Sequence, residues 1–157
     1  NQGQADIYGG ETGIEVLATG WLRGFANFGY QEVVDQTALE PRGRRGTPRI
    51  KINAGLQGNW ANGLNAEVVV HHVGSAIYPV DPSFQTFANL SLIPTSTVPT
   101  SRVNHYTLLN LRCGYRFWRD HVEVAISVFN ALNDRHREHP LADVLGSRVM
   151  GWLTLKL

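Results

Sequence analysis

The densest cluster of charged side chains in the sequence is a group of arginines near residue 45. Arg42, Arg44 and Arg45 lie almost side by side, and Arg49 follows closely. A guanidinium group presents several N–H donors in a rigid fork that matches the oxygens of a carboxylate or phosphate. These arginines are therefore candidates for binding an anionic ligand, or the phosphate groups of lipopolysaccharide. The competing interpretation is a solvated surface loop with no ligand.

A second group with possible chemistry lies near residue 138. His136 and His139 flank Arg137 and Glu138. Two histidines three residues apart can share a metal ion on the face of a helix, but the surrounding residues are typical of a loop. We therefore interpret the two histidines as loop residues and expect no metal. Arg137 remains a further candidate for contact with an anionic ligand.

No arrangement of residue types predicts an enzyme. The sequence has no glycine-rich phosphate loop, no Gly-x-Ser-x-Gly motif and no paired-carboxylate pattern. Serine, histidine and aspartate all occur, but their spacing does not suggest a catalytic triad. The single cysteine, Cys113, excludes an intrachain disulfide framework and a zinc site made of several cysteines. We therefore expect no catalysis and no cofactor, and the net charge of +1 gives no expectation of nucleic-acid binding.

The elements that must position these residues show a hydrophobic period of two, which is typical of strands with one apolar face. No segment shows a convincing helical period of 3.6. The alternation predicts an all-β fold of about seven long antiparallel strands in a meander. The clearest strands cover residues 50–60, 107–117, 122–128 and 148–157, and weaker ones cover residues 5–16, 21–31 and 64–74.

Short and long connections alternate along the chain. The short ones are residues 18–20, 61–63 and 119–120, and the long ones are residues 32–47, 78–104 and 134–146. In a meander, this alternation places every tight turn at one end of the sheet and every long loop at the other. Outer-membrane barrels have this arrangement, with short periplasmic turns and long extracellular loops. The expected strands are also long enough for a membrane-spanning strand, which needs about nine to eleven residues.

Two architectures fit the alternating faces. In an outer-membrane barrel the apolar face contacts lipid and the polar face lines the lumen, and Trp21, Trp60 and Trp118 beside the tight turns would form an aromatic girdle. In a soluble β-sandwich or barrel that binds a small ligand or glycan, the apolar face is instead the core. Charged residues make up 17% of the chain, against about a quarter in a typical soluble domain. Low charge, long strands and the loop alternation favour the membrane barrel.

Four stretches of the sequence resemble the C-terminal barrel strands of TonB-dependent outer-membrane receptors. They are Ile7-Tyr8-Gly9-Gly10-Glu11, the segment 106–117, the segment 124–134, and the residues from Arg135 to Arg148. The order and spacing of the four stretches are more specific than any one of them, and together they cover essentially the whole chain. The resemblance implies structural roles for Glu11, Tyr115, Asn130, Asn133, Gly146 and Arg148.

The resemblance also implies what the chain is part of. Barrels of this family have about 22 strands, so seven strands are about a third of one, and the plug domain and the other strands lie outside residues 1–157. The implied function is TonB-energised transport of a scarce nutrient, such as an iron chelate, across the bacterial outer membrane. The family usually ends in phenylalanine, whereas this chain ends in Leu157. An isolated segment of a barrel is expected to self-associate, because its edge strands and apolar face have no partner.

Overall fold

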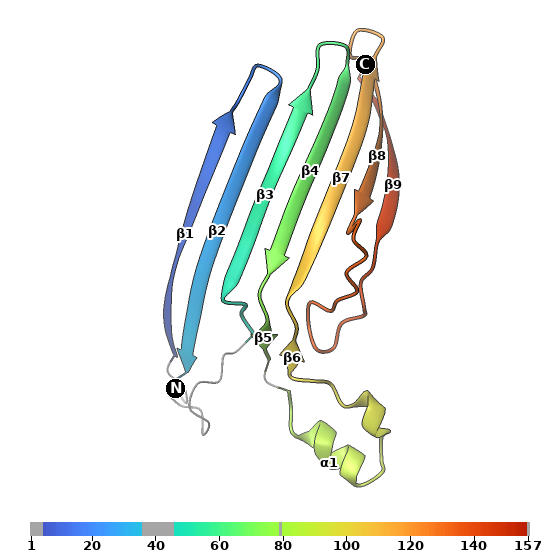
Figure 1. Cartoon of the computed structure of the whole chain (residues 1–157). Helices are drawn as coiled ribbons and strands as arrows, with labels where there is room; N and C mark the ends of the chain where they lie inside the picture. Colours follow the sequence, from blue (N-terminus) through green and yellow to red (C-terminus); the bar gives the residue numbers. More distant parts are fainter. Residues whose placement is uncertain (1–4, 36–45, 79, 157) are drawn as a thin grey trace.

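The computed structural model describes residues 5–35, 46–78 and 80–156, and its main element is a seven-stranded antiparallel sheet (Figure 1). The strand order is β1-β2-β3-β4-β7-β8-β9, so that strands adjacent in the sheet follow one another along the chain. The strands are β1 (Ala5–Leu17), β2 (Leu22–Asp35), β3 (Ile50–Asn59), β4 (Leu64–Val73), β7 (Tyr106–Phe117), β8 (Val122–Phe129) and β9 (Arg148–Leu155). The predicted all-β meander of about seven strands is confirmed.

The structure differs from the sequence-based expectation in two segments. Strand β2 continues to Asp35, beyond its predicted end at residue 31, because Val33 and Val34 stay paired with β1. The connection between β4 and β7 also contains structure that the sequence does not predict. It holds the short pair β5 (Ala76–Ile77) and β6 (Arg102–Val103), the helix α1 (Ser83–Asn89) and a 3-10 turn (Thr95–Thr97).

Helix α1 is not predicted from the sequence because seven residues are too few to show a helical period of 3.6. Just before it, the Asp81 carboxylate accepts the backbone N–H of Ser83 at 2.8 Å. This hydrogen bond holds the pKa of Asp81 below its usual range. No helix within residues 5–35, 46–78 and 80–156 is long and apolar enough to cross a bilayer.

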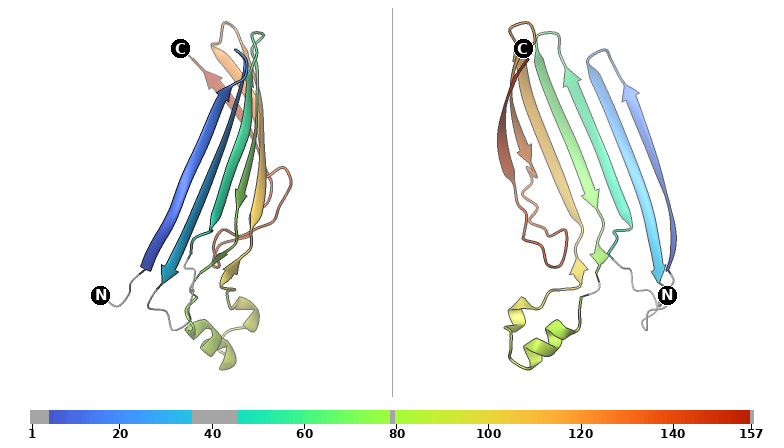
Figure 2. Two further views of the ribbon diagram at one scale, coloured as in Figure 1. Left: turned by 60° about the vertical axis from the view of Figure 1, so that its left-hand side comes forward. Right: turned by 180° about the vertical axis from the view of Figure 1, so that it is seen from behind.

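The connections separate to opposite ends of the sheet, as predicted (Figures 1 and 2). We call the end with the three tight turns the turn end, and the end with the long connections the loop end. The β3–β4 turn requires its glycine, since Gly63 has a φ of +91° and an added Cβ would lie 2.1 Å from the Arg116 carbonyl oxygen. The β7–β8 turn instead places Trp118, Arg119 and Asp120 at positive φ.

The register aligns most of the large apolar residues of the seven strands on one face. Ala54 lies opposite Val70, and Leu56 lies opposite Val68. Val68 in turn lies opposite Leu111 on β7. The residues that pair with Leu111 and its neighbours on β8 and then on β9 lie on this same face. A slip of one residue between any two strands would move one set of side chains to the other side. The sheet therefore has one largely apolar face and one face that carries most of the polar side chains together with some apolar ones such as Val69, as the alternation predicts.

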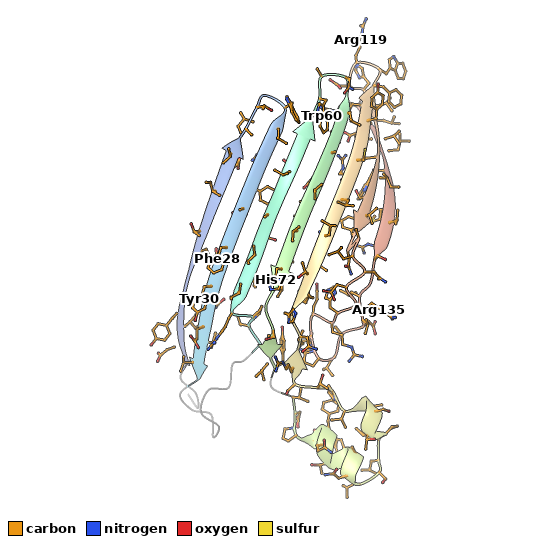
Figure 3. All side chains as sticks on the ribbon, in the orientation of Figure 1. Phe28, Tyr30, Trp60, His72, Arg119 and Arg135 are labelled. Atoms are coloured by element: carbon orange, nitrogen blue, oxygen red, sulfur yellow. The ribbon has the colours of Figure 1, made fainter. Side chains whose placement is uncertain are left out.

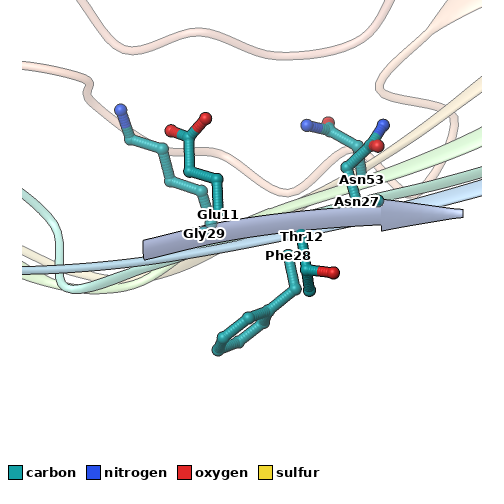
Figure 4. A pocket seen from close by; sticks show the side chains of 8 residues that line it. Glu11, Thr12, Asn27, Phe28, Gly29 and Asn53 are labelled. Carbon is teal, nitrogen blue, oxygen red and sulfur yellow. The ribbon is translucent and has the colours of Figure 1, made fainter. Parts of the chain in front are cut away.

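Figure 4 shows this separation on β1, β2 and β3, where Glu11, Asn27 and Asn53 project to one side and Phe28 and Thr12 project to the other. Glu11, Asn27 and Asn53 come from three neighbouring strands and lie on one face of the ribbon. The residues that alternate along the sequence therefore project to two chemically different faces of the sheet.

The polar face is the less exposed of the two. On the polar face, Asn65 and Ser127 retain only 6% and 5% of their accessible surface. On the apolar face, Leu56, Ile126 and Leu153 are 56%, 52% and 67% exposed. Side chains on the inside of a curved sheet are crowded by their neighbours, so the polar face is the concave one. This burial pattern is the reverse of that in a soluble domain, where apolar side chains are inside.

The apolar face has no covering layer in the part of the chain that the structure describes. Among these residues, no large side chain is fully buried. The buried apolar residues are few, and they are Val73, Ala76, Ala88, Val103, Tyr106, Val122 and Ala125. A soluble sandwich would need a second sheet against the apolar face, and the described residues do not form one. The fold is instead that of a wall segment of an outer-membrane barrel, with an apolar exterior and a polar interior.

Candidate ligand site at the loop end

The two longest described connections contact each other at the loop end. We call residues 74–105 the β4–β7 loop and residues 130–147 the β8–β9 loop. The hydroxyl of Tyr78 donates to the carbonyl oxygen of Glu138 at 3.2 Å, and its ring lies edge-on to His139 with centroids 4.9 Å apart. At the base of the loops, Tyr106 stacks on His136. These contacts join segments that are far apart in the sequence.

Asparagine side chains shape the β8–β9 loop where β8 ends. Asn130 and Asn133 both have a φ of +52°, a conformation that asparagine adopts more readily than most residues. The Asn130 side chain exchanges two hydrogen bonds of 3.0 Å with the backbone of Asp134. The Asp134 carboxylate in turn accepts the backbone N–H of Thr107 on β7 at 2.9 Å, and Asn133 accepts that of Ser147 at 3.1 Å. The loop is therefore anchored to β7 on one side and to the start of β9 on the other.

A pocket of about 520 Å³ lies between the two loops, and we call it the inter-loop pocket. Arg102 contributes from the β4–β7 loop, and Arg135 and Arg137 contribute from the β8–β9 loop. None of these three arginines forms an ion pair with another described residue. The one acid that lines the pocket, Asp134, already binds the N–H of Thr107. With three arginines against one carboxylate, the lining of the pocket carries a net positive charge.

His136 lines the same pocket and is 8% exposed. Its Nδ1 atom lies 2.7 Å from the carbonyl oxygen of Asp134, and because a carbonyl only accepts, Nδ1 carries a proton. The Nε2 atom is shielded from solvent and lies 3.9 Å from a carboxylate oxygen of Glu138. It has no hydrogen-bond partner among the residues described. One ring nitrogen therefore keeps unused hydrogen-bonding capacity.

The anion-binding candidates from the sequence have different outcomes. Arg42, Arg44 and Arg45 lie outside the described residues. Arg137 lies in the inter-loop pocket, together with Arg102 and Arg135, which the sequence did not single out. The sequence does show that both arginines are charged residues in expected loops. No pattern of neighbouring residues, however, shows that the two loops contact each other. Across the described ranges, no three His, Cys, Asp and Glu side chains are grouped to hold a metal ion.

The residues singled out by the family resemblance do not form one site. Glu11 lies on the polar face and Tyr115 on the apolar face, where it is 49% exposed. Gly146 lies in the β8–β9 loop. Arg148 begins β9, and its guanidinium carbon lies 5.1 Å from the centre of the Phe129 ring. The roles that the resemblance implies for these four residues stay predictions.

A hydrogen-bonded cluster on the polar face ties three strands together near the turn end. The Arg112 guanidinium on β7 bonds to Glu123 on β8 and to Asn65 on β4. Gly114 leaves room for the cluster, since an added Cβ would lie 2.7 Å from Asn65 Oδ1. Because Arg112 and Glu123 neutralise each other, this cluster has a structural rather than a ligand-binding arrangement, although Asn65 Nδ2 has no hydrogen-bond partner among the described residues.

Comparison with known proteins gives a match in fold. No protein-family model matches the sequence, and no curated protein does either. The structure is similar to that of the ferric-catecholate import receptor Fiu from E. coli K12 in its closed form, with a TM-score of 0.71 over 96% of this chain. The two sequences are 12% identical, so the similarity concerns the fold alone. This chain covers 20% of the receptor chain, and its sheet therefore has the fold of one part of that receptor.

Proposed function

We propose that this chain forms part of the barrel wall of a bacterial outer-membrane receptor, whose plug domain and remaining strands lie outside residues 1–157. The observation that carries the proposal is the reversed burial of the two faces. An uncovered apolar face fits contact with membrane lipid, and a half-buried polar face fits an enclosed lumen. Continuous antiparallel pairing satisfies the backbone groups that lipid cannot.

Aromatic side chains at both ends of the sheet support this orientation in a membrane. At the turn end, Trp21 stacks on Trp60 with centroids 5.4 Å apart, and Trp118 is 75% exposed. At the loop end, Tyr8 and Tyr30 are exposed on the apolar face. Figure 3 labels Tyr30 and Trp60 near opposite ends of the sheet. Tryptophan and tyrosine concentrate at both membrane–water interfaces, so the two groups mark the borders of a lipid-facing band.

The function that fits such a wall is uptake rather than catalysis. The long loops would capture a scarce, large nutrient, most simply an iron chelate, and TonB would supply energy through the plug. The fold similarity to an import receptor for ferric catecholate supports a receptor role. No step in this mechanism requires a nucleophile or a general base from this chain.

Cys113 provides a direct test of the lipid-facing wall. It is the only cysteine of the chain, it is exposed, and it lies on the apolar face opposite Ile126. A nitroxide attached to Cys113 in protein reconstituted into outer-membrane lipids should be relaxed by oxygen rather than by a water-soluble nickel complex. The matched control is Asn53→Cys in a Cys113→Ala background, because Asn53 lies on the polar face. Equal nickel accessibility at both positions would contradict the proposed wall.

Transport needs a separate test. The polypeptide that carries this chain should restore growth of an iron-limited strain that lacks its own chelate receptors, and only when TonB is intact. A panel of ferric chelates would identify the ligand. If the protein inserts but no chelate supports TonB-dependent growth, the iron assignment is wrong, whatever the Cys113 experiment shows.

A further inference from the structure

The inter-loop pocket gathers more positive charge than the fold requires. Arg102, Arg135 and Arg137 belong to two different loops, and none has an acidic partner in the part of the chain described. Other arginines of the sheet are paired, such as Arg112 with Glu123 and Arg23 with Glu15. The lining offers these three guanidinium groups only one carboxylate, that of Asp134, so an excess of positive charge remains for a ligand to neutralise.

Contacts between and within the loops hold the backbone segments that carry these arginines, so the pocket exists before any ligand enters. Tyr78 joins the loops through Glu138 and His139, and the Asp134 carboxylate fixes the β8–β9 loop to the N–H of Thr107. None of these contacts uses an arginine of the pocket. A site that is formed in advance loses less entropy when it binds a ligand.

His136 provides a second, independent indication of a ligand. The ring lines the pocket, is held by the Asp134 carbonyl oxygen and Tyr106, and is more than nine-tenths buried. Its Nε2 atom has no hydrogen-bond partner among the described residues. Because Nδ1 carries the proton of the neutral ring, Nε2 is an acceptor, and a ligand O–H, such as that of a singly protonated phosphate, could supply the missing partner.

We propose that the inter-loop pocket is a phosphate-binding site, with Arg102, Arg135 and Arg137 as its donors. Planar guanidinium forks match phosphate oxygens, and three cations favour a group with more than one negative charge. The phosphate could belong to a soluble ligand or to the headgroup of lipopolysaccharide. The inference rests on the proposed function only for placing the loop end outside the cell.

Titration of the purified protein in detergent micelles with pyrophosphate tests the site. The test variant combines Arg102→Gln, Arg135→Gln and Arg137→Gln, and its control is Arg119→Gln. Figure 3 shows Arg119 at the turn end and Arg135 towards the loop end, so the control removes a positive charge far from the pocket. Wild type and the control should bind alike, and the triple variant should bind about tenfold more weakly or worse. Circular dichroism confirms that each variant keeps its strands.

Competition identifies the source of the phosphate. If lipopolysaccharide displaces pyrophosphate and its dephosphorylated form does not, the site accepts a lipid headgroup. If only small phosphates compete, the site takes a soluble ligand, and either result supports a phosphate site. Absent binding by the wild type, equal binding by the triple variant, or equal weakening by Arg119→Gln would overturn the inference. The nitroxide experiment on Cys113 does not involve the pocket, so failure here is distinguishable from failure of the barrel wall.

Discussion

The ring of Tyr106 stacks on the ring of His136, with centroids 4.0 Å apart and an interplanar angle of 21°. Tyr106 is the first residue of β7, whereas His136 lies in the middle of the β8–β9 loop. The two residues are 7% and 8% exposed, which makes them part of the small buried core of the chain. The pocket that we assign to phosphate is therefore attached to the rigid end of a strand.

Removing the Tyr106 ring should weaken the site without changing its charge. Tyr106→Ala should lower phosphate affinity, because His136 and the neighbouring arginines lose their support. It should also reduce the free energy of unfolding by about 3 kcal/mol, in the range for deleting a buried aromatic side chain. Tyr106→Phe keeps the stacked ring and serves as the control. Pyrophosphate titration and urea unfolding in micelles measure both effects, and wild-type affinity in the alanine variant would show that the stack does not support the pocket.

Asn130 offers a test of how the β8–β9 loop is held. Asn130→Ala removes both hydrogen bonds to the Asp134 backbone and leaves a residue with a Cβ at a φ of +52°. We expect a loss of about 2 kcal/mol in the free energy of unfolding, the sum of lost hydrogen bonds and backbone strain. Asn130→Gly removes the same bonds but tolerates positive φ, so it should lose less. If glycine is as damaging as alanine in urea unfolding, backbone strain does not contribute.

The Arg112 cluster should depend on the small size of Gly114. In Gly114→Ala, the new Cβ would lie 2.7 Å from Asn65 Oδ1 and 3.0 Å from Glu123 Oε1. The cluster must shift, and we expect a loss of about 1–3 kcal/mol in unfolding free energy, as for other overpacked sites. Gly151→Ala is the control, because nothing lies within 4 Å of a Cβ built there. Equal stability of the two variants would mean that the cluster adapts at no cost.

The sequence predicts the sheet well because alternation is local information. Strand β3 is expected at residues 50–60 and found at Ile50–Asn59, and β7 is expected at residues 107–117 and found at Tyr106–Phe117. Each strand's own pattern also decides which side chains share a face. The inter-loop pocket could not be predicted in this way. Whether the loop with Arg102 meets the loop with Arg137 depends on contacts such as Tyr78 with His139, which leave no periodic signal.

A charge on the apolar face gives the sharpest distinction between a membrane wall and a surface exposed to water. Val68 lies on β4 between Leu56 and Leu111, and it is 43% exposed. In a bilayer, Val68→Lys should cost about 2–4 kcal/mol, because a charge near the midplane of a lipid-facing strand loses its hydration. In water, lysine on an uncovered sheet face would be tolerated. Gln57→Lys is the matched control, since Gln57 lies on the polar face of the adjacent strand.

The measurement is urea unfolding of the two variants from lipid vesicles, repeated in a short-chain detergent. Val68→Lys should be destabilised strongly in the bilayer and less in the detergent, where water reaches the face more easily. Gln57→Lys should unfold like the wild type in both, because a polar lumen accepts a charge. Equal tolerance of both lysines in vesicles would mean that lipid does not contact the apolar face. The burial pattern would then require another covering surface.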